Sequence, residues 1–355
     1  MRSCDSSAIS QSSFSTSRKH SGSNLLWTCL RGLGLLVCLV ATLWAAGALH
    51  FDLPKVGSIL ALAWAASSLV LLWFTRARPW VFAIWAALFF AILTWWLSLR
   101  PTSDAPWQPD VDRTAWADTS GDTVTIHNVR NCDYRTETDY TPHWDVRSYA
   151  LSKLTGADIF ITHWGPTWIA HPIISFDFDG QHVAFSVETR MKIGQSYSAI
   201  EGFYRQFGLI YVVADERDVI RLRTNYRKGE EVCIYHLRLP LQAVRLLWTG
   251  YVRHLDQLHE RPQWYNAVAD NCTTSVRSDI TATLGRPARP FDWRMLANGY
   301  MDEMLYEDGN LAGDLPFAEL KERAHINDAA RAADRDPDFS VRIREGRPGF
   351  PNPRL

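Results

Sequence analysis

The sequence predicts an α+β protein in which three N-terminal transmembrane helices precede a mixed domain of strands and helices. Three observations predict this fold class. Three apolar runs of roughly 20 residues lie within the first hundred positions. A strongly alternating β-hairpin pattern and a long amphipathic helix pattern follow in the remainder. The 355 residues suffice for two or three units, so the part after the apolar runs can bury a core of its own.

The three apolar runs contain no charged side chain: they cover Gly32 to Phe51, Val56 to Thr75 and Pro79 to Leu99. Buried core helices are one alternative, but unbroken runs of this length are unusual in soluble domains. A cleavable signal peptide is a second, because Ala46 and Ala48 offer small residues near the end of the first run. That run is about twice the usual length of a signal-peptide core. We therefore expect a three-helix membrane anchor over residues 25–100.

Basic residues predict the orientation of this anchor. They precede the first run and fill the loop between the second and third runs: Arg18, Lys19, Arg31, Arg76 and Arg78. Basic residues beside membrane spans remain on the cytoplasmic side. Residues after Leu99 are therefore expected outside the cytoplasm.

Composition divides the rest of the chain. Residues 1–24 are Ser-rich without apolar periodicity and are expected to form a disordered cytoplasmic tail. Residues 101–109, with Pro, Ser and Asp, predict a linker. A folded domain is expected over residues 110–310, and residues 311–355 are expected to form a charged C-terminal extension.

Charge and cysteine content exclude several classes. The first hundred residues hold 8 of the 37 basic and 2 of the 38 acidic residues, so the remainder is mildly acidic. A nucleic-acid partner would require a basic face, and none is expected. Cys132, Cys233 and Cys272 are too few for a disulfide framework, although one bridge between Cys132 and Cys233 stays open. Neither Cys-x-x-Cys nor His-Glu-x-x-His occurs, so neither a metal nor a cofactor is expected.

The element pattern after the anchor is mixed. Strands are predicted at Thr123–Val129 (as an edge strand), Ala157–Trp164, Leu209–Val213 and Glu231–Leu237. Helices are predicted at Trp144–Leu154, Ser196–Phe207, Leu241–Leu258 and Trp293–Tyr306. The charge-dense stretch Asp215–Arg223 predicts a solvated helix, with Asp218 and Arg221 at helical spacing.

A hairpin is the clearest local signal. Ala170–Phe178 and Gln181–Glu188 alternate, and Asp179-Gly180 between them is typical of a type I′ turn. With Phe178 opposite Gln181, His171 lies opposite Glu188. One face is apolar, and the other carries His171, Ser175, Asp177, His182, Ser186 and Glu188. Such a polar face indicates either solvent exposure or the lining of a cleft.

Cys272 is a candidate nucleophile. It opens a stretch to Leu284 that fits a helix capped by Asn271, and a helix N-terminus favours the thiolate. A small buried core cysteine is the alternative. A thiol nucleophile needs a base with an orienting partner. His171 and Glu188 offer both, because cross-strand partners have Cβ atoms roughly 5 Å apart; a surface His–Glu pair is the alternative.

Several motifs together resemble the Lnb N-terminal periplasmic domain family. They are Trp164-Gly165, Ile169–Phe178, Phe185–Arg190, Val213–Asp218, Arg223–Arg227, Pro262–Ala267 and Asn271–Thr274. The family is bacterial and envelope-associated, and Lnb itself is a lipoprotein N-acyltransferase. A wider similarity is to permuted papain-like thiol enzymes, of the NlpC or LRAT type, in which a strand histidine precedes a helix-borne cysteine.

The resemblance implies a papain-like domain after the anchor, with Cys272 as nucleophile and His171 as base. The register argument adds Glu188 as the residue that orients His171, and His182 is the alternative orienting residue. Asn271 and Thr273 at the helix start would form the oxyanion region.

We expect a multi-pass protein of the bacterial inner membrane with its C-terminal domain in the periplasm. The implied function is a cysteine acyltransferase or hydrolase that acts through an acyl-enzyme, with membrane lipids or lipoproteins as partners. A peptidoglycan stem-peptide amidase or peptidase is the alternative chemistry. A non-catalytic envelope binding module is the alternative class.

Overall fold

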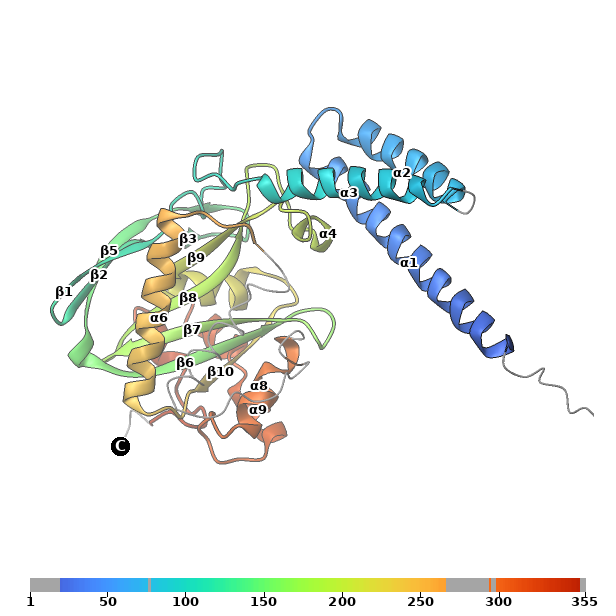
Figure 1. The fold of residues 1–355 in the computed structure, drawn as a ribbon. Coiled ribbons are helices and arrows are strands. Elements are labelled where there is room, and N and C mark those ends of the chain that lie inside the picture. The colour runs from blue at the N-terminus through green and yellow to red at the C-terminus, as the bar shows by residue number, and fades with distance from the viewer. Residues whose placement is uncertain (1–19, 76–77, 266–293, 295–297, 352–355) are drawn as a thin grey trace, which may run out of the picture. The chain divides into compact units, whose positions relative to one another are not determined.

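The computed structural model describes residues 20–75, 78–265, 294 and 298–351 (Figure 1). The chain forms two compact units that divide between Leu99 and Arg100. The first unit contains α1 (His20–Asp52), α2 (Gly57–Phe74) and α3 (Trp80–Ser98). All three are long and apolar enough to cross a membrane, as predicted. α1 begins at His20, so residues 20–24 are helical and are not part of the predicted tail, whose other residues lie outside the described part.

The second unit is built on a sheet with the strand order β1-β2-β9-β8-β7-β6-β10, and β5 pairs with β2. The strands are β1 (Trp116–Ser120), β2 (Thr123–Arg130), β5 (Trp144–Ala150), β6 (Leu154–His163), β7 (Ala170–Phe178), β8 (Gln181–Arg190), β9 (Gly208–Ala214) and β10 (Glu231–His236). A separate ribbon joins β3 (Asp133–Tyr134) to β4 (Tyr140–Thr141). The pairing of β2 with β9 is parallel, whereas β6, β7, β8 and β9 pair antiparallel. The predicted α+β class is confirmed.

The hairpin of β7 and β8 has the predicted register. Asp179 and Gly180 have φ values of 57° and 89°, the positive values that a type I′ turn requires. Phe178 pairs with Gln181, and the pairing continues to Ile173 opposite Ser186. The turn therefore fixes which side chains of the two strands share a face.

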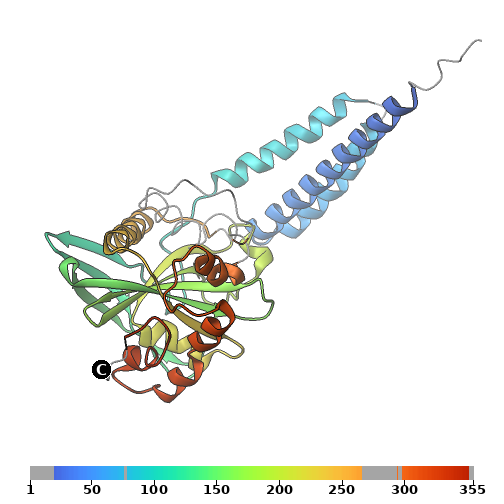
Figure 2. The same ribbon diagram turned by 90° about the horizontal axis from the view of Figure 1, so that it is seen from below.

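Both faces of the hairpin are buried. The apolar face packs under α6 (Leu241–Glu260), where Trp248 meets Phe176 edge to face with ring centroids 5.1 Å apart. The opposite face packs against α5 (Glu216–Arg221), α10 (Asn327–Ala332) and α11 (Phe339–Arg342). In Figure 2, the gold α6 lies on one side of the green sheet, and part of the red C-terminal segment lies on the other side. Ile173 belongs to this second apolar cluster, which explains an apolar residue on the polar face.

Residues after 310 form part of the second compact unit. α8 (Met301–Glu307) and α9 (Phe317–Ala324) precede α10 and α11. Leu320 packs in the core below α6, whereas Ile326, Phe339 and Ile343 pack in the core on the other face of the sheet. The charged segment thus has enough apolar side chains to fold onto the sheet.

Three predictions about strands and helices are wrong. Residues 144–150 form strand β5, not a helix, because they pair along the whole of β2. The predicted edge strand is also wrong. β2 pairs with β5 on one side and with β1 on the other, so it lies inside the sheet. Within Ser196–Phe207 the helix is limited to α4 (Ala199–Gly202), and the predicted helix from Trp293 is described only from Asn298 onward.

The helix after Asp215 exists, but it is buried. Asp218 is fully buried and pairs with Arg130 at 2.7 Å, not with Arg221. The sequence predicts a solvated helix here because the partners of its charged side chains lie far away along the chain. Cys132 and Cys233 are both free and buried, so the possible bridge between them is absent.

Candidate functional site

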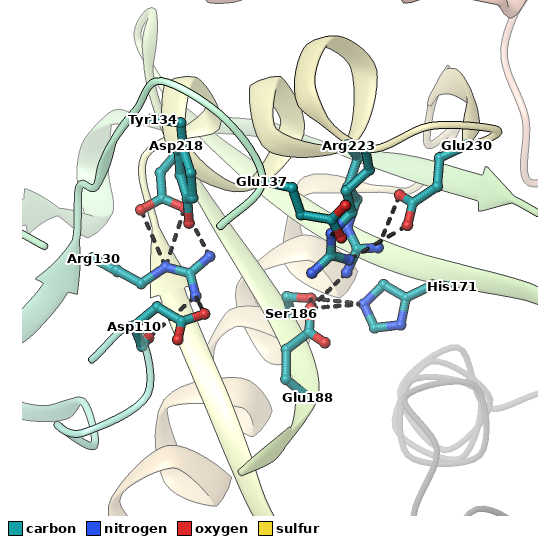
Figure 3. A network of polar contacts seen from close by, with 11 residues as sticks. Asp110, Arg130, Tyr134, Glu137, His171, Ser186, Glu188, Asp218, Arg223 and Glu230 are labelled. Carbon is teal, nitrogen blue, oxygen red and sulfur yellow. Dashed lines mark hydrogen bonds and ion pairs between the residues drawn. The ribbon is translucent and has the colours of Figure 1, made fainter. Parts of the chain in front are cut away.

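The site centres on His171, the second residue of β7. Its Nε2 lies 2.7 Å from the Ser186 hydroxyl and 3.3 Å from Glu188 Oε1, and Ser186 donates to the same carboxylate oxygen at 2.7 Å (Figure 3). Since β7 and β8 are paired in the predicted register, all three side chains share one face of the hairpin. The predicted contact between His171 and Glu188 is confirmed.

These hydrogen bonds determine the tautomer of the imidazole. The Ser186 proton goes to Glu188, so the bond between Nε2 and Ser186 requires a proton on Nε2. In the neutral ring Nδ1 then carries the free lone pair. No residue in the described part of the chain hydrogen-bonds to Nδ1. The ring is therefore held by one nitrogen and keeps the other as a base.

Glu188 is held as a carboxylate. Arg223 Nη2 donates to Glu188 Oε1 at 2.7 Å, and Arg223 Nη1 lies 3.2 Å from Glu230 Oε2 (Figure 3). Burial raises the pKa of Glu188, but the charges of His171 and Arg223 outweigh this effect and hold the pKa well below its usual range.

A π-helix, Leu222–Tyr226, presents Arg223 to the hairpin. It continues from α5, which begins where the Asp215 side chain accepts from the Arg217 N–H at 2.8 Å. The bond from Arg227 N to Leu222 O, 2.9 Å long, closes the π turn. Burial alone would lower the pKa of Arg223, yet Glu188 and Glu230 raise it above its ordinary value.

Residues 140–299 match the Lnb N-terminal periplasmic domain family. The resemblance predicted from the motifs is confirmed, and His171, Glu188 and Arg223 all lie within the matched segment. No curated protein and no solved structure matches the chain. With the three candidate membrane spans, this Lnb-type domain indicates a membrane-associated periplasmic protein.

His182 does not contact His171 in the Lnb-type domain. Its Nδ1 lies 4.0 Å from Glu216 Oε1, in a second buried cluster on the same face of the sheet. Glu188 is six positions after His182 on β8, which is about 20 Å along a strand. The alternative prediction that His182 orients His171 is therefore wrong.

The second cluster is built around Arg344. Arg344 Nη2 lies 2.6 Å from Glu216 Oε1 and 2.8 Å from Asp158 Oδ2. Ser175 donates to Glu216 at 2.6 Å, and His236 Nδ1 lies 2.8 Å from Asp158 Oδ1. Burial raises the pKa of Glu216, but Arg344 and His182 lower it to about 2. The cluster joins the C-terminal segment to the sheet.

Cys272, Asn271 and Thr273 lie outside the described residues, but the chain on either side of them is described. On one side, Trp264 bridges Gly208 and Tyr265 N donates to Phe207 O at 3.0 Å. Gly208 pairs with Arg190, two residues beyond Glu188. Residue 265 therefore lies at the end of the sheet that carries the His171 site.

The chain returns to the same end at Gly299. Its N–H donates to Trp168 O at 3.2 Å, and its carbonyl lies 3.2 Å from His163 Nε2. His163 pairs with Ala170, the neighbour of His171. A Cβ at position 299 would lie 2.0 Å from Thr167 O, so only glycine permits this close approach.

Sequence reasoning missed three residues of the site: Ser186, Arg223 and Glu230. The alternation predicts the correct face for Ser186 but no role for it. Arg223 stands in one of the Lnb-type motifs, which was the available signal, whereas Glu230 carried none. No cluster of His, Cys, Asp and Glu suited to a metal occurs in the part of the chain that the structure describes.

Proposed function

We propose that this protein is a membrane-anchored periplasmic thiol enzyme in which Cys272 is the nucleophile and His171 the base. The observation that carries the proposal is the His171 ring, whose Nε2 is held by Ser186 and Glu188 while Nδ1 keeps a free lone pair. A base bound through one nitrogen to a carboxylate is what a cysteine nucleophile requires. The proposed domain type is the permuted papain-like one.

In the proposed reaction His171 Nδ1 accepts the Cys272 thiol proton, and the thiolate attacks the carbonyl carbon of an ester or amide. The bond to the leaving alcohol or amine breaks, and the leaving group takes the proton from His171. Cys272 is then acylated as a thioester. An amine or water then attacks the thioester carbonyl, and His171 takes the proton of the attacking group. The bond between the acyl carbon and Cys272 Sγ breaks, and the released Cys272 takes the proton back from His171. Glu188 stabilises the imidazolium in both steps, and Asn271 and Thr273 supply backbone N–H groups for the oxyanion.

The described flanks support this pairing of Cys272 with His171. Tyr265 and Gly299 both lie at the His171 end of the sheet. The seven residues from Tyr265 to Cys272 span at most about 25 Å when extended. The length of the chain therefore permits Cys272 to reach that end.

We propose membrane lipids or lipoproteins as the acyl-group substrates. The Lnb-type domain follows the third candidate span after a short linker, so the domain encounters its substrates close to a bilayer. Acyl esters of lipids and lipoproteins are held at high effective concentration there. A peptidoglycan stem-peptide amidase would use the same residues on a different carbonyl, and a binding module would use none of them.

The proposed location is the bacterial inner membrane, with the Lnb-type domain in the periplasm. A reporter enzyme that works only outside the cytoplasm, fused after Leu355, is expected to be active. Basic residues precede the first span and lie in the loop between the second and third spans, so both places are expected on the cytoplasmic side and the residues after the third span outside it. The same fusion with a reporter active only in the cytoplasm serves as the control. An active cytoplasmic reporter with an inactive periplasmic one contradicts the topology.

Trapping of the acyl-enzyme tests the proposed reaction. Full-length protein incubated with phospholipid or lipoprotein is expected to acquire an acyl group on Cys272 that neutral hydroxylamine releases, detected by intact-protein mass spectrometry. Burial raises the pKa of the Cys132 thiol to about 12 and that of Cys233 to about 11, so neither competes for acylation. The Cys272→Ala variant is the control.

The outcomes separate the alternatives. Cys272-dependent cleavage of stem peptides without a lipid-derived adduct supports the amidase. A binding module would show neither adduct nor cleavage, and its Cys272 would resist alkylation at neutral pH.

A further inference from the structure

Six large apolar side chains are exposed in two connections of the Lnb-type domain. We call them the apolar rim: Trp164, Trp168, Ile193, Tyr197, Ile200 and Phe203. Among described residues after position 100, only four other large apolar side chains are similarly exposed, and none of those is aromatic: Val146, Leu241, Leu246 and Val341. Single exposed apolar residues are ordinary, but a concentration of this kind marks an interaction surface.

The two connections lie at one end of the sheet. The first joins β6 to β7, where His163 pairs with Ala170. The second joins β8 to β9, where Arg190 pairs with Gly208. Since β7 and β8 are antiparallel, the start of β7 and the end of β8 coincide, and Figure 1 shows the β6–β7 turn and α4 on the same side of the domain. The apolar rim therefore borders the end that carries His171 and Glu188.

The linker from the third candidate span is attached beside the rim. Trp107 bridges Lys192, and Ile193 N donates to Pro106 O at 2.8 Å. The Arg190 guanidinium lies over the Trp107 ring, 4.4 Å from its centroid, which fixes the linker further. The seven residues from Leu99 to Pro106 span at most about 25 Å. Chain length alone therefore keeps Pro106, whose carbonyl accepts from the Ile193 N–H, within about 25 Å of Leu99.

We propose that the apolar rim docks onto the bilayer surface and seats the His171 end of the sheet against the lipid headgroups. Its Trp, Tyr, Phe and Ile side chains suit the membrane–water interface. Lys192, the neighbour of Ile193, is exposed and matches anionic headgroups. The short tether selects a bilayer rather than a soluble partner as the occupant. The docking goes beyond the proposed reaction and does not require Cys272.

Photo-crosslinking of the full-length protein in vesicles of phosphatidylethanolamine and phosphatidylglycerol tests the docking. A benzophenone amino acid replaces Ile200, Phe203 or, as the matched control, Val146; these side chains are 63%, 55% and 63% exposed. Val146 lies on β5, outside both connections. Lipid adducts, measured by mass spectrometry, are expected to be at least about tenfold more abundant at positions 200 and 203 than at 146, because only rim residues enter the headgroup layer.

Equal lipid labelling at all three positions overturns the proposal, as does the absence of lipid adducts at 200 and 203. Crosslinks from these positions to a second copy or to another protein, without lipid adducts, also overturn it and assign the rim to a protein partner. The measurement is repeated in the Cys272→Ala variant, where the lipid adducts are expected to be unchanged. A failed reaction with intact lipid labelling contradicts the proposed function alone.

Discussion

Replacing His171 by alanine is expected to lower Cys272-dependent turnover of a phospholipid or lipoprotein substrate by roughly 10²–10⁴-fold, the usual contribution of a general base. The change removes Nδ1, and it also leaves Ser186 and Glu188 without the ring that they hold. The thermal unfolding temperature is expected to change little, because Glu188 keeps its contact with Arg223. Turnover and thermal unfolding of the full-length protein in detergent check this result.

His182→Ala is the matched control for His171→Ala. His182 lies near Glu216, about 20 Å along β8 from Glu188, so its loss should leave turnover unchanged. Glu188→Gln is expected to slow turnover less than His171→Ala, because a neutral amide still accepts a hydrogen bond but no longer stabilises the imidazolium. Full activity of His171→Ala, or loss of activity in His182→Ala alone, contradicts the assignment of the base.

Replacing Arg344 by alanine is expected to destabilise the domain by about 3–5 kcal/mol, the usual cost of removing one partner from a buried ion pair. Arg344 is buried and contacts both Glu216 and Asp158, so the variant leaves two buried carboxylates without their cation. Denaturant unfolding at neutral pH measures the difference. Arg342→Ala is the control, because Arg342 is exposed and its pairs with Asp336 and Glu345 lie at the surface.

The effect of Arg344→Ala should also depend on pH. The pKa of Glu216 is lowered from 4.5 to about 2 in the folded protein, so its stabilising contribution is present above about pH 4.5 and is lost as the pH falls towards 2. The difference in unfolding free energy between wild type and Arg344→Ala should therefore shrink between pH 4.5 and pH 3. A difference that is constant over this range excludes the Glu216 pairing as its source.

The hairpin was predictable because its information is local. Asp179-Gly180 sets the turn, the alternation sets the faces, and the register then brings His171 to Glu188. The three apolar helices were predictable for the same reason, since length and composition suffice. These elements carry their own signals within about 20 residues.

The remaining features depend on partners that are distant along the chain. β5 was predicted as a helix because its pairing with β2 carries no signal in residues 144–150. The burial of Asp218 depends on Arg130, which lies 88 residues earlier. Arg223 reaches Glu188 only because α5 and its π turn lie across the hairpin. The burial of such charged residues cannot be predicted from the neighbouring sequence, because their ion-pair partners are brought close only by the tertiary fold.

The position of Arg344 in the chain also constrains when the domain can finish folding. Arg344 follows Glu216 by 128 residues and Asp158 by 186. Before Arg344 packs against them, both carboxylates must stay hydrated. The face of the sheet that bears Ser175 therefore cannot be buried until then. Contacts between such distant residues form slowly because a long loop must close first. Docking of α11 should therefore be a late step, and a chain still being synthesised would keep that face open to solvent and to chaperones.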